Sequence, residues 1–301
     1  MQLSGTDLRL LRVFAAVVEH QGFAAAQVEL NVGQSTISNH ITALEQRLGI
    51  RLCQRGRAGF RLTEKGARVY QAVVDLLRTL DDFSSETAAL RRELVGRIRI
   101  GLVDAIITDS NCRISETFAA FNQRSHSVLF EIVQGVPQSL QVKVLSGELD
   151  VAVGSFPNRL PGLQMFPLHS ESQCLYCGRR HRLFSVPEYK IESAAILREQ
   201  AVGRAYWRSS HTNNKAFVNT KATVHSIEHQ IMLILSGNYV GFLPDHAAHD
   251  YVAQGELRAL KPDQFTYVTD FHLITKGTSK RSRVVETFLK DLQTSYGITA
   301  G

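Results

Sequence analysis

Residues 23–49 of the chain read FAAAQVELNVGQSTISNHITALEQRLG. Three alanines follow Phe23, and their small side chains suit a position that a neighbouring helix must approach closely. Later in the stretch, apolar residues recur at spacings of four, three and four positions. These patterns predict helices over Phe23–Leu30 and Gln34–Leu48. Asn31 suits the left-handed backbone position that ends a helix, so a tight turn joins the two. Two helices joined in this way predict a helix-turn-helix.

The outward face of the second helix is polar. It carries Gln34, Ser35, Thr36, Ser38, Asn39 and His40. Amide side chains pair bidentately with adenine in the major groove, so this face suits the reading of duplex DNA. A further helix is predicted over Thr6–His20, with Thr6 or Asp7 as its N-cap. Arg51–Thr63 predicts two short strands around Arg57, which form a basic wing beside the DNA.

Much of the chain's net charge of +6 lies just behind this helix. Six basic residues stand against the single acid Glu64 in this region: Arg47, Arg51, Arg55, Arg57, Arg61 and Lys65. Such a patch is suited to DNA phosphates. A basic run is also typical of an ordinary solvated face, and a plain three-helix bundle with a polar surface is the alternative.

The stretch from Leu8 to Gly66 resembles the N-terminal head of the LysR-type transcriptional regulators. The residues that carry the resemblance are Phe14, Phe23 to Ala26, Leu30, Gln34 to Ser38, Ile41, Leu44, Glu45, Leu48, Gly49, Leu52, Arg55 and Leu62 to Gly66. The resemblance implies that Gln34, Ser35, Ser38 and Asn39 approach base edges, and that Arg55 reaches the DNA from the wing. Charge adds Arg57 to the predicted DNA-binding set. The chain departs from the family at Gly33, Ser35 and Cys53, so its half-site preference is expected to differ.

A long helix is predicted from Glu64 to about Val95, with Thr63 as its cap and Gly96 at its end. Its apolar seam repeats at spacings of four and three and consists of Val69, Val73, Leu76, Leu80, Phe83, Thr87, Leu90 and Leu94. A heptad seam favours a coiled-coil dimer, which would match two DNA half-sites. The alternative is that the helix buries this seam against its own domain. The resemblance implies tetramers assembled from dimers.

From Arg97 onward strands and helices alternate, which predicts parallel sheets covered by helices. Predicted strands are Ile98–Val103, Val128–Val133, Leu149–Val153, Gln173–Cys177, Gln200–Ala205, Lys221–Val224 and Tyr239–Leu243. Predicted helices are about Asn111–Gln123, Gln138–Ser146, Ser226–Ser236 and Arg281–Thr294. The chain leaves a first lobe near Pro161 and crosses back over Asp263–Thr275, so two lobes enclose a cleft. This layout resembles the effector-binding domain of the same family, which is itself similar to periplasmic binding proteins.

The predicted fold class is therefore α/β overall, in three parts. A winged helix-turn-helix occupies residues 1–62 and a dimerising linker helix residues 63–96. A two-lobed effector-binding domain occupies residues 97–301. Lobe I takes about 97–163 and 266–301, and lobe II about 164–265.

Ligands of such sheets bind beyond the carboxyl ends of the strands. The predicted effector-binding residues are Asp104, Ala105, Val136, Pro137, Phe156, Arg204, Tyr206, Trp207 and Ser226. Asp104 follows the first strand directly and favours a hydroxyl or amine on the ligand. Arg204 suits an anionic group, and the aromatic residues suit a ring. Each has an ordinary alternative; Phe156, for example, also suits packing under the hinge.

Two other motifs carry no predicted chemistry. His225, Glu228 and His229 have the spacing of one zinc protease class, but they begin the helix that the family uses beside its effector cleft. Cys174 and Cys177 fall on a strand, where residues three apart face opposite sides. The sequence has no nucleophile elbow, phosphate-binding loop or dinucleotide fingerprint. We therefore expect no catalytic residue, no metal site and no cofactor apart from a small-molecule effector.

The sequence also limits where the protein works. Its apolar runs are far shorter than the roughly 18 residues of a membrane span, and its start lacks the layout of a secretory signal. We expect a cytoplasmic regulator whose partners are duplex DNA, an effector, further copies of the chain and RNA polymerase. An enzyme or solute-binding protein with an incidental helical head is the competing class, and a regulator without any effector is a third. The effector, the target genes and the direction of regulation stay open.

Overall fold

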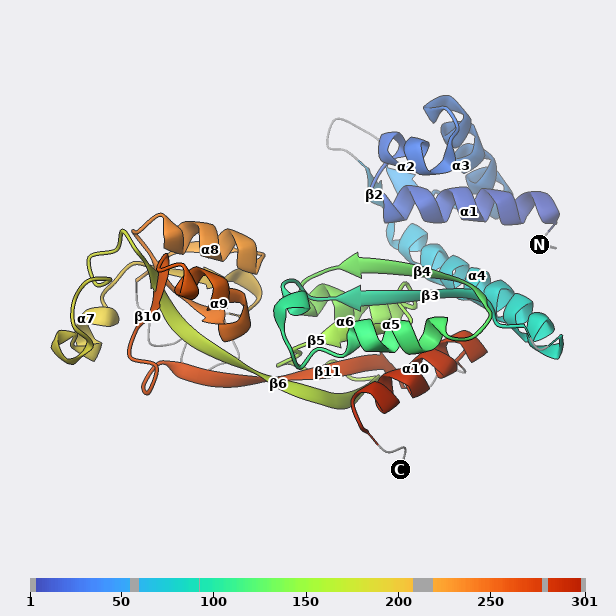
Figure 1. Cartoon of the computed structure of the whole chain (residues 1–301). Helices are drawn as coiled ribbons and strands as arrows, with labels where there is room; N and C mark the ends of the chain where they lie inside the picture. Colours follow the sequence, from blue (N-terminus) through green and yellow to red (C-terminus); the bar gives the residue numbers. More distant parts are fainter. Residues whose placement is uncertain (1–3, 55–59, 92, 208–218, 278–280, 299–301) are drawn as a thin grey trace. The chain divides into compact units, whose positions relative to one another are not determined.

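The computed structural model describes residues 4–54, 60–91, 93–207, 219–277 and 281–298. The chain forms two compact units, Met1–Arg91 and Arg92–Gly301. Figure 1 shows the first unit as mainly helical and the second as a sheet with helices. No helix in the described ranges combines the length and the apolar character needed to cross a membrane.

The first unit is a winged helix-turn-helix, as predicted. Its elements are α1 (Gly5–Glu19), α2 (Phe23–Leu30), α3 (Gln34–Leu48), β1 (Cys53–Gln54), β2 (Arg61–Leu62) and α4 (Glu64–Leu90). The side chains of Phe14, Ile37 and Leu44 are fully buried in its core. Asn31 takes the predicted left-handed conformation, with φ 50° and ψ 40°. The two short strands pair antiparallel, so the predicted wing is present at its base.

The start of α1 differs from the prediction, because Ser4 is the N-cap instead of Thr6 or Asp7. Asp7 lies three positions into the helix, and its carboxylate accepts a hydrogen bond from the Ser4 backbone at 2.7 Å. The same carboxylate accepts one from Arg47 of α3 at 2.9 Å. The Ser4 and Asp7 side chains thus form a capping box, which is a better arrangement for the first turn than a cap by Asp7 alone.

The predicted end of the long helix is also wrong. α4 ends at Leu90, and Val95–Leu102 forms the first strand of the second unit. The alternation of buried residues at Ile98 and Ile100 continues toward the N-terminus as part of the strand, so Gly96 lies within a strand. Leu94 packs in the core of the second unit. The apolar seam divides as well. Val69, Val73 and Leu76 pack in the core of the head, whereas Phe83 is 65% and Leu90 87% exposed.

Within the described part of the second unit, nine strands form one sheet in the order β4-β3-β5-β11-β6-β9-β7-β8, with β10 paired to β6. The strands are β3 (Val95–Leu102), β4 (Ser127–Gln134), β5 (Val151–Gly154), β6 (Leu163–Gly178), β7 (Ala201–Arg204), β8 (Thr220–Val224), β9 (Val240–Pro244), β10 (Leu257–Ala259) and β11 (Thr266–Lys276). The helices include α5 (Ile114–Asn122), α6 (Pro137–Ser146), α7 (Ser193–Ile196), α8 (Ile227–Leu235), α9 (Asp245–Ala253) and α10 (Arg283–Ser295), with short 3₁₀ turns at η1 (Ile106–Thr108), η2 (Glu188–Lys190) and η3 (Ala205–Trp207).

The two crossings between the lobes are long strands, which corrects the prediction of two separate parallel sheets. β6 and β11 pair antiparallel from Leu163 opposite Lys276 to Cys174 opposite Thr266. Figure 1 shows them running side by side from one lobe to the other. Pro167 weakens the strand pattern of this stretch, and the structure accommodates it beside a register shift opposite Phe271 and His272. Both lobes therefore share one mixed sheet.

The cysteine prediction is confirmed. Cys174 and Cys177 both lie on β6 as buried free thiols. They belong to different hydrophobic clusters, Cys177 packing with Leu175 and Cys174 with Tyr176. A disulfide between them is therefore excluded by their opposite orientations.

Candidate functional site

The first candidate site is the outer surface of α3. Gln34, Ser35, Thr36 and Asn39 are exposed, while Ser38 and His40 are half-buried. Positions of the same helix spaced by four and three face the core, where Ile37, Ile41 and Leu44 are fully buried. The N-cap of α3 is Gly33, so no side chain caps the amide groups at this positive helix end. Arg55 and Arg57 of the predicted wing lie outside the described residues.

A second candidate site is a small pocket between the two lobes of the second unit. Its walls are Val103, Asp104, Pro137, Ser155, Glu171, Arg204, Tyr206, Ile227 and Phe271. Most of these residues follow the carboxyl ends of strands or begin α6 and α8. The sheet topology therefore gathers at one place residues that are far apart in the sequence, as the rule for open α/β sheets predicts.

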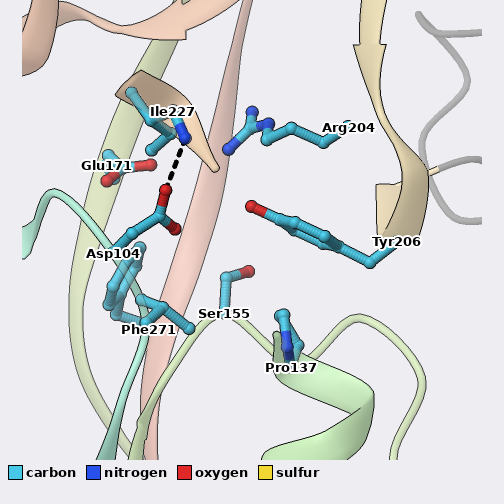
Figure 2. Close-up of a pocket in the computed structure, with 9 residues that line it drawn as sticks. Asp104, Pro137, Ser155, Glu171, Arg204, Tyr206, Ile227 and Phe271 are labelled. Atoms are coloured by element: carbon cyan, nitrogen blue, oxygen red, sulfur yellow. Dashed lines mark hydrogen bonds between the residues drawn. The ribbon is translucent and has the colours of Figure 1, made fainter. Parts of the chain in front are cut away.

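Asp104 of lobe I forms a hydrogen bond to lobe II. Its Oδ2 atom accepts a hydrogen bond of 2.5 Å from the backbone N–H of Ile227, the first residue of α8 (Figure 2). Burial is the main influence on its pKa and raises it, and this hydrogen bond and Arg204 oppose the rise. A carboxylate at the positive end of a helix is stabilised by the helix dipole. Asp104 thus joins the lobes and lines the pocket at the same time.

Arg204 and Tyr206 lie across the pocket from Asp104, and Figure 2 shows their polar ends directed toward it. Arg204 is buried, and its Nη2 donates to Gln173 Oε1 at 2.7 Å. The Tyr206 hydroxyl accepts a hydrogen bond from Arg204, and burial raises the pKa of Tyr206 to about 12. The phenol therefore stays neutral, and the pocket offers a cation and a hydroxyl opposite a carboxylate.

The structure brings four of the nine predicted effector residues to the pocket wall: Asp104, Pro137, Arg204 and Tyr206. Phe156 is 4% exposed and packs with Leu140 and Leu163 in the core. Successive residues of an extended chain face opposite sides, so Ser155 meets the pocket and Phe156 turns away from it. The predicted role of Phe156 in stacking on a ring is therefore not supported by its position.

Three of the other four predicted residues are neighbours in sequence of pocket residues but are not part of the pocket wall. Ala105 packs beside the cluster under α8, and Val136 is the N-cap of α6. Ser226 is the N-cap of α8, and its hydroxyl accepts a hydrogen bond from the backbone of His229 at 3.2 Å. The side chain of Trp207 lies outside the described part of the chain.

Sequence reasoning missed Val103, Ser155, Glu171, Ile227 and Phe271. Ser155 lies in the loop after β5, which the strand pattern places at the correct edge of the sheet. Glu171 and Phe271 lie on the crossing strands β6 and β11. No sequence signal indicated Glu171 or Phe271, because the segments that contain them were not expected to form strands.

Comparison with known proteins identifies the family. Residues 8–67 match the model of the bacterial regulatory helix-turn-helix proteins of the lysR family, and residues 91–296 match the LysR substrate binding domain. The chain belongs to the LysR family. This LysR-family chain is 37% identical over 295 residues to the HTH-type transcriptional activator BauR of Pseudomonas aeruginosa, covering 98% of this chain and 97% of that protein. It is 26% identical over 222 residues to BenM of Acinetobacter baylyi, covering 74% and 71%.

Solved structures of full-length relatives share the fold. ArgP from Mycobacterium tuberculosis superposes with a TM-score of 0.62 at 21% identity, covering 98% of both chains. CbnR in complex with its target DNA superposes with a TM-score of 0.61 at 17% identity, covering 96% of this chain and 99% of that one. The predicted helix-turn-helix head and α/β effector domain are confirmed. This LysR-family protein is a DNA-binding transcriptional regulator controlled by an effector.

Proposed function

We propose that this regulator reads DNA as a dimer through α3 and responds to a small molecule that carries both an amine and an acid group. The observation that supports the ligand class is the opposition of Asp104 to Arg204 and Tyr206 across one pocket. A carboxylate favours a cationic amine, and a guanidinium favours a carboxylate or another anion.

The effector acts on the link between the lobes. Hydrogen bonds at the pocket join the two lobes: the Ile227 backbone donates to Asp104, and Gln138 Nε2 donates to the Tyr206 backbone oxygen at 2.9 Å. A ligand that contacts Asp104 and Tyr206 changes the balance of these bonds. It shifts the lobes only to the extent that it binds one arrangement more tightly than the other.

The DNA-reading surface is the outer face of α3, whose residues face the major groove: Gln34, Ser35, Thr36, Ser38, Asn39 and His40. Arg55 and Arg57 contact the backbone or the minor groove from the wing. The exposed seam around Phe83 and Leu90 pairs with a second copy, and dimers assemble into tetramers. The protein works in the cytoplasm with RNA polymerase, needs no cofactor other than its effector and performs no catalysis.

Intrinsic fluorescence tests the ligand class, because the single tryptophan, Trp207, directly follows Tyr206 in the sequence. The full chain is titrated with amino acids that differ in the spacing between amine and carboxylate. Alkylamines and monocarboxylic acids of the same lengths serve as controls. We expect saturable quenching or enhancement by one amino acid and weaker binding of the matched amine and acid.

Tyr206→Phe removes only the hydroxyl from the pocket. A hydrogen bond to a charged group contributes about 1.5–3 kcal/mol, so we expect the variant to bind that amino acid at least roughly tenfold more weakly. A thermal melt verifies that it folds. Equal affinity for the amino acid and for the plain acid, together with an unaffected Tyr206→Phe variant, would contradict the proposed ligand class.

A further inference from the structure

A second polar cluster lies at the junction of the lobes, next to the pocket. Within the described part of the chain, one group of three His, Asp or Glu side chains has its donor atoms within 4.8 Å of one another: Asp109, Glu171 and His246. Asp109 directly follows η1 in lobe I, Glu171 lies on the crossing strand β6, and His246 lies in the first turn of α9 in lobe II. The cluster therefore draws on both lobes and on the strand between them.

The donor atoms of this cluster are held in place by their neighbours. His246 Nε2 lies 2.9 Å from Glu171 Oε2, and its Nδ1 lies 2.8 Å from the hydroxyl of Thr108. Gln173 donates to the other carboxylate oxygen of Glu171. Hydrogen bonds from a second layer of groups fix the orientation of metal ligands in known sites, and these contacts have that form.

Asp109 is the buried carboxylate that lobe I supplies to this cluster. Its side chain is 5% exposed, and its Oδ1 accepts a hydrogen bond from the Asn111 backbone at 2.8 Å. Its Oδ2 is also buried and lies 2.9 Å from Nε2 of His169. Burial of a carboxylate is costly unless the charge is paired, and a bound cation would supply such a pair.

His169 adds a fourth donor beside Asp109. Its Nε2 lies 2.9 Å from Asp109 Oδ2, so the two buried side chains are in direct polar contact. The ring stacks on Phe271 and Tyr296, with centroid distances of 4.9 and 5.8 Å.

We propose that Asp109, Glu171 and His246, with His169 beside them, bind a divalent first-row transition metal that joins lobe I to lobe II. Imidazole nitrogen with carboxylate oxygen suits zinc and its neighbours better than magnesium or calcium. The three residues are separated by more than sixty positions in the sequence, which is why no spacing motif indicated the site. Glu171 also lines the effector pocket, so the metal and the effector share one side chain.

The test is a calorimetric titration of the full chain, stripped with a chelator, with Zn²⁺ alone. Co²⁺ absorption serves as a second readout of the coordination geometry. We expect one ion per chain. Loss of one surrounding hydrogen-bond partner costs about 10- to 100-fold in metal affinity, so loss of a ligand should cost at least 100-fold. Asp109→Asn and His246→Ala should both show this loss. Asp109→Asn preserves the side-chain shape and the acceptor for Asn111.

Two matched controls exclude exposed histidines as the binding site. His249→Ala removes an exposed histidine from the same helix, α9. The double variant His225→Ala, His229→Ala removes the exposed pair whose spacing resembles a zinc motif. Both controls should bind Zn²⁺ like the wild type. Absence of saturable binding, equal binding by Asp109→Asn, or loss only in the double variant would overturn the proposal.

Discussion

Replacing Asp104 by Asn tests the role of the pocket carboxylate. The amide oxygen of Asn still accepts the hydrogen bond from the Ile227 backbone, so the start of α8 stays capped. The negative charge that faces a ligand amine is lost. A charge-assisted hydrogen bond contributes about 1.5–3 kcal/mol, and 1.4 kcal/mol corresponds to a factor of ten. We therefore expect affinity for an amine-bearing effector to fall roughly 10- to 150-fold.

The pH dependence gives this prediction a second test. Burial raises the pKa of Asp104 in the free protein, and an amine binds only the ionised carboxylate. Affinity for the effector should therefore fall as the pH decreases through this raised pKa and recover above it. Asp104→Asn should show no such dependence.

Tryptophan fluorescence titrations over a pH series measure both effects. Asp263→Asn makes the same chemical change at an exposed position and should leave affinity and its pH profile unchanged. Wild-type affinity in Asp104→Asn, or an equal loss for a matched acid that lacks the amine, would contradict the proposed contact between Asp104 and the ligand amine.

Three further predictions concern the framework. A Cβ atom on Gly66 would lie 2.0 Å from the Leu52 carbonyl oxygen. Gly66→Ala should therefore lower the free energy of unfolding, measured by denaturant titration, by at least about 1–3 kcal/mol. Gly5→Ala is the control and should change it by less, because a Cβ atom there would meet nothing within 4 Å. Hydrogen bonds from Ser4 lower the pKa of Asp7. The stability that they supply should be present above about pH 4, the ordinary range of an aspartate, and should be lost as the pH falls through the lowered pKa. Acid melts in which Asp7→Asn has the same profile as the wild type would contradict this. Burial raises the pKa of Cys177 to about 12, so a thiol reagent at neutral pH should modify it only after unfolding, and rapid modification of the native protein would contradict its position in the core.

The head was predictable because short-range patterns decide its structure. Asn31 ends α2 by its own backbone preference, and the spacing of Ile37, Ile41 and Leu44 defines the buried face of α3. The N-cap was harder to predict, because Ser4 acts through a side chain three residues away. The end of α4 was mispredicted because the heptad spacing continues through Leu94, although that residue packs in another unit.

The pocket was predictable only where residues follow a recognisable strand. Asp104 comes just after β3 and Arg204 ends β7, and both patterns are visible in the sequence. Glu171 and Phe271 depend on the pairing of two long strands, which the sequence does not indicate because Pro167 interrupts one of them. The metal-binding cluster depends on the same pairing and on α9, which was not predicted either.

The central claim is that α3 and the wing of a dimer read a specific DNA sequence. Selection from random duplex DNA at near-physiological salt tests it, with the wild type compared to an Asn39→Ala, Arg55→Ala variant. A good bidentate base contact contributes about 1–3 kcal/mol of discrimination, so the variant should lose most of the enrichment. We expect an enriched inverted repeat for the wild type alone. Weak binding that depends only on salt, or the same repeat selected by both proteins, would contradict it.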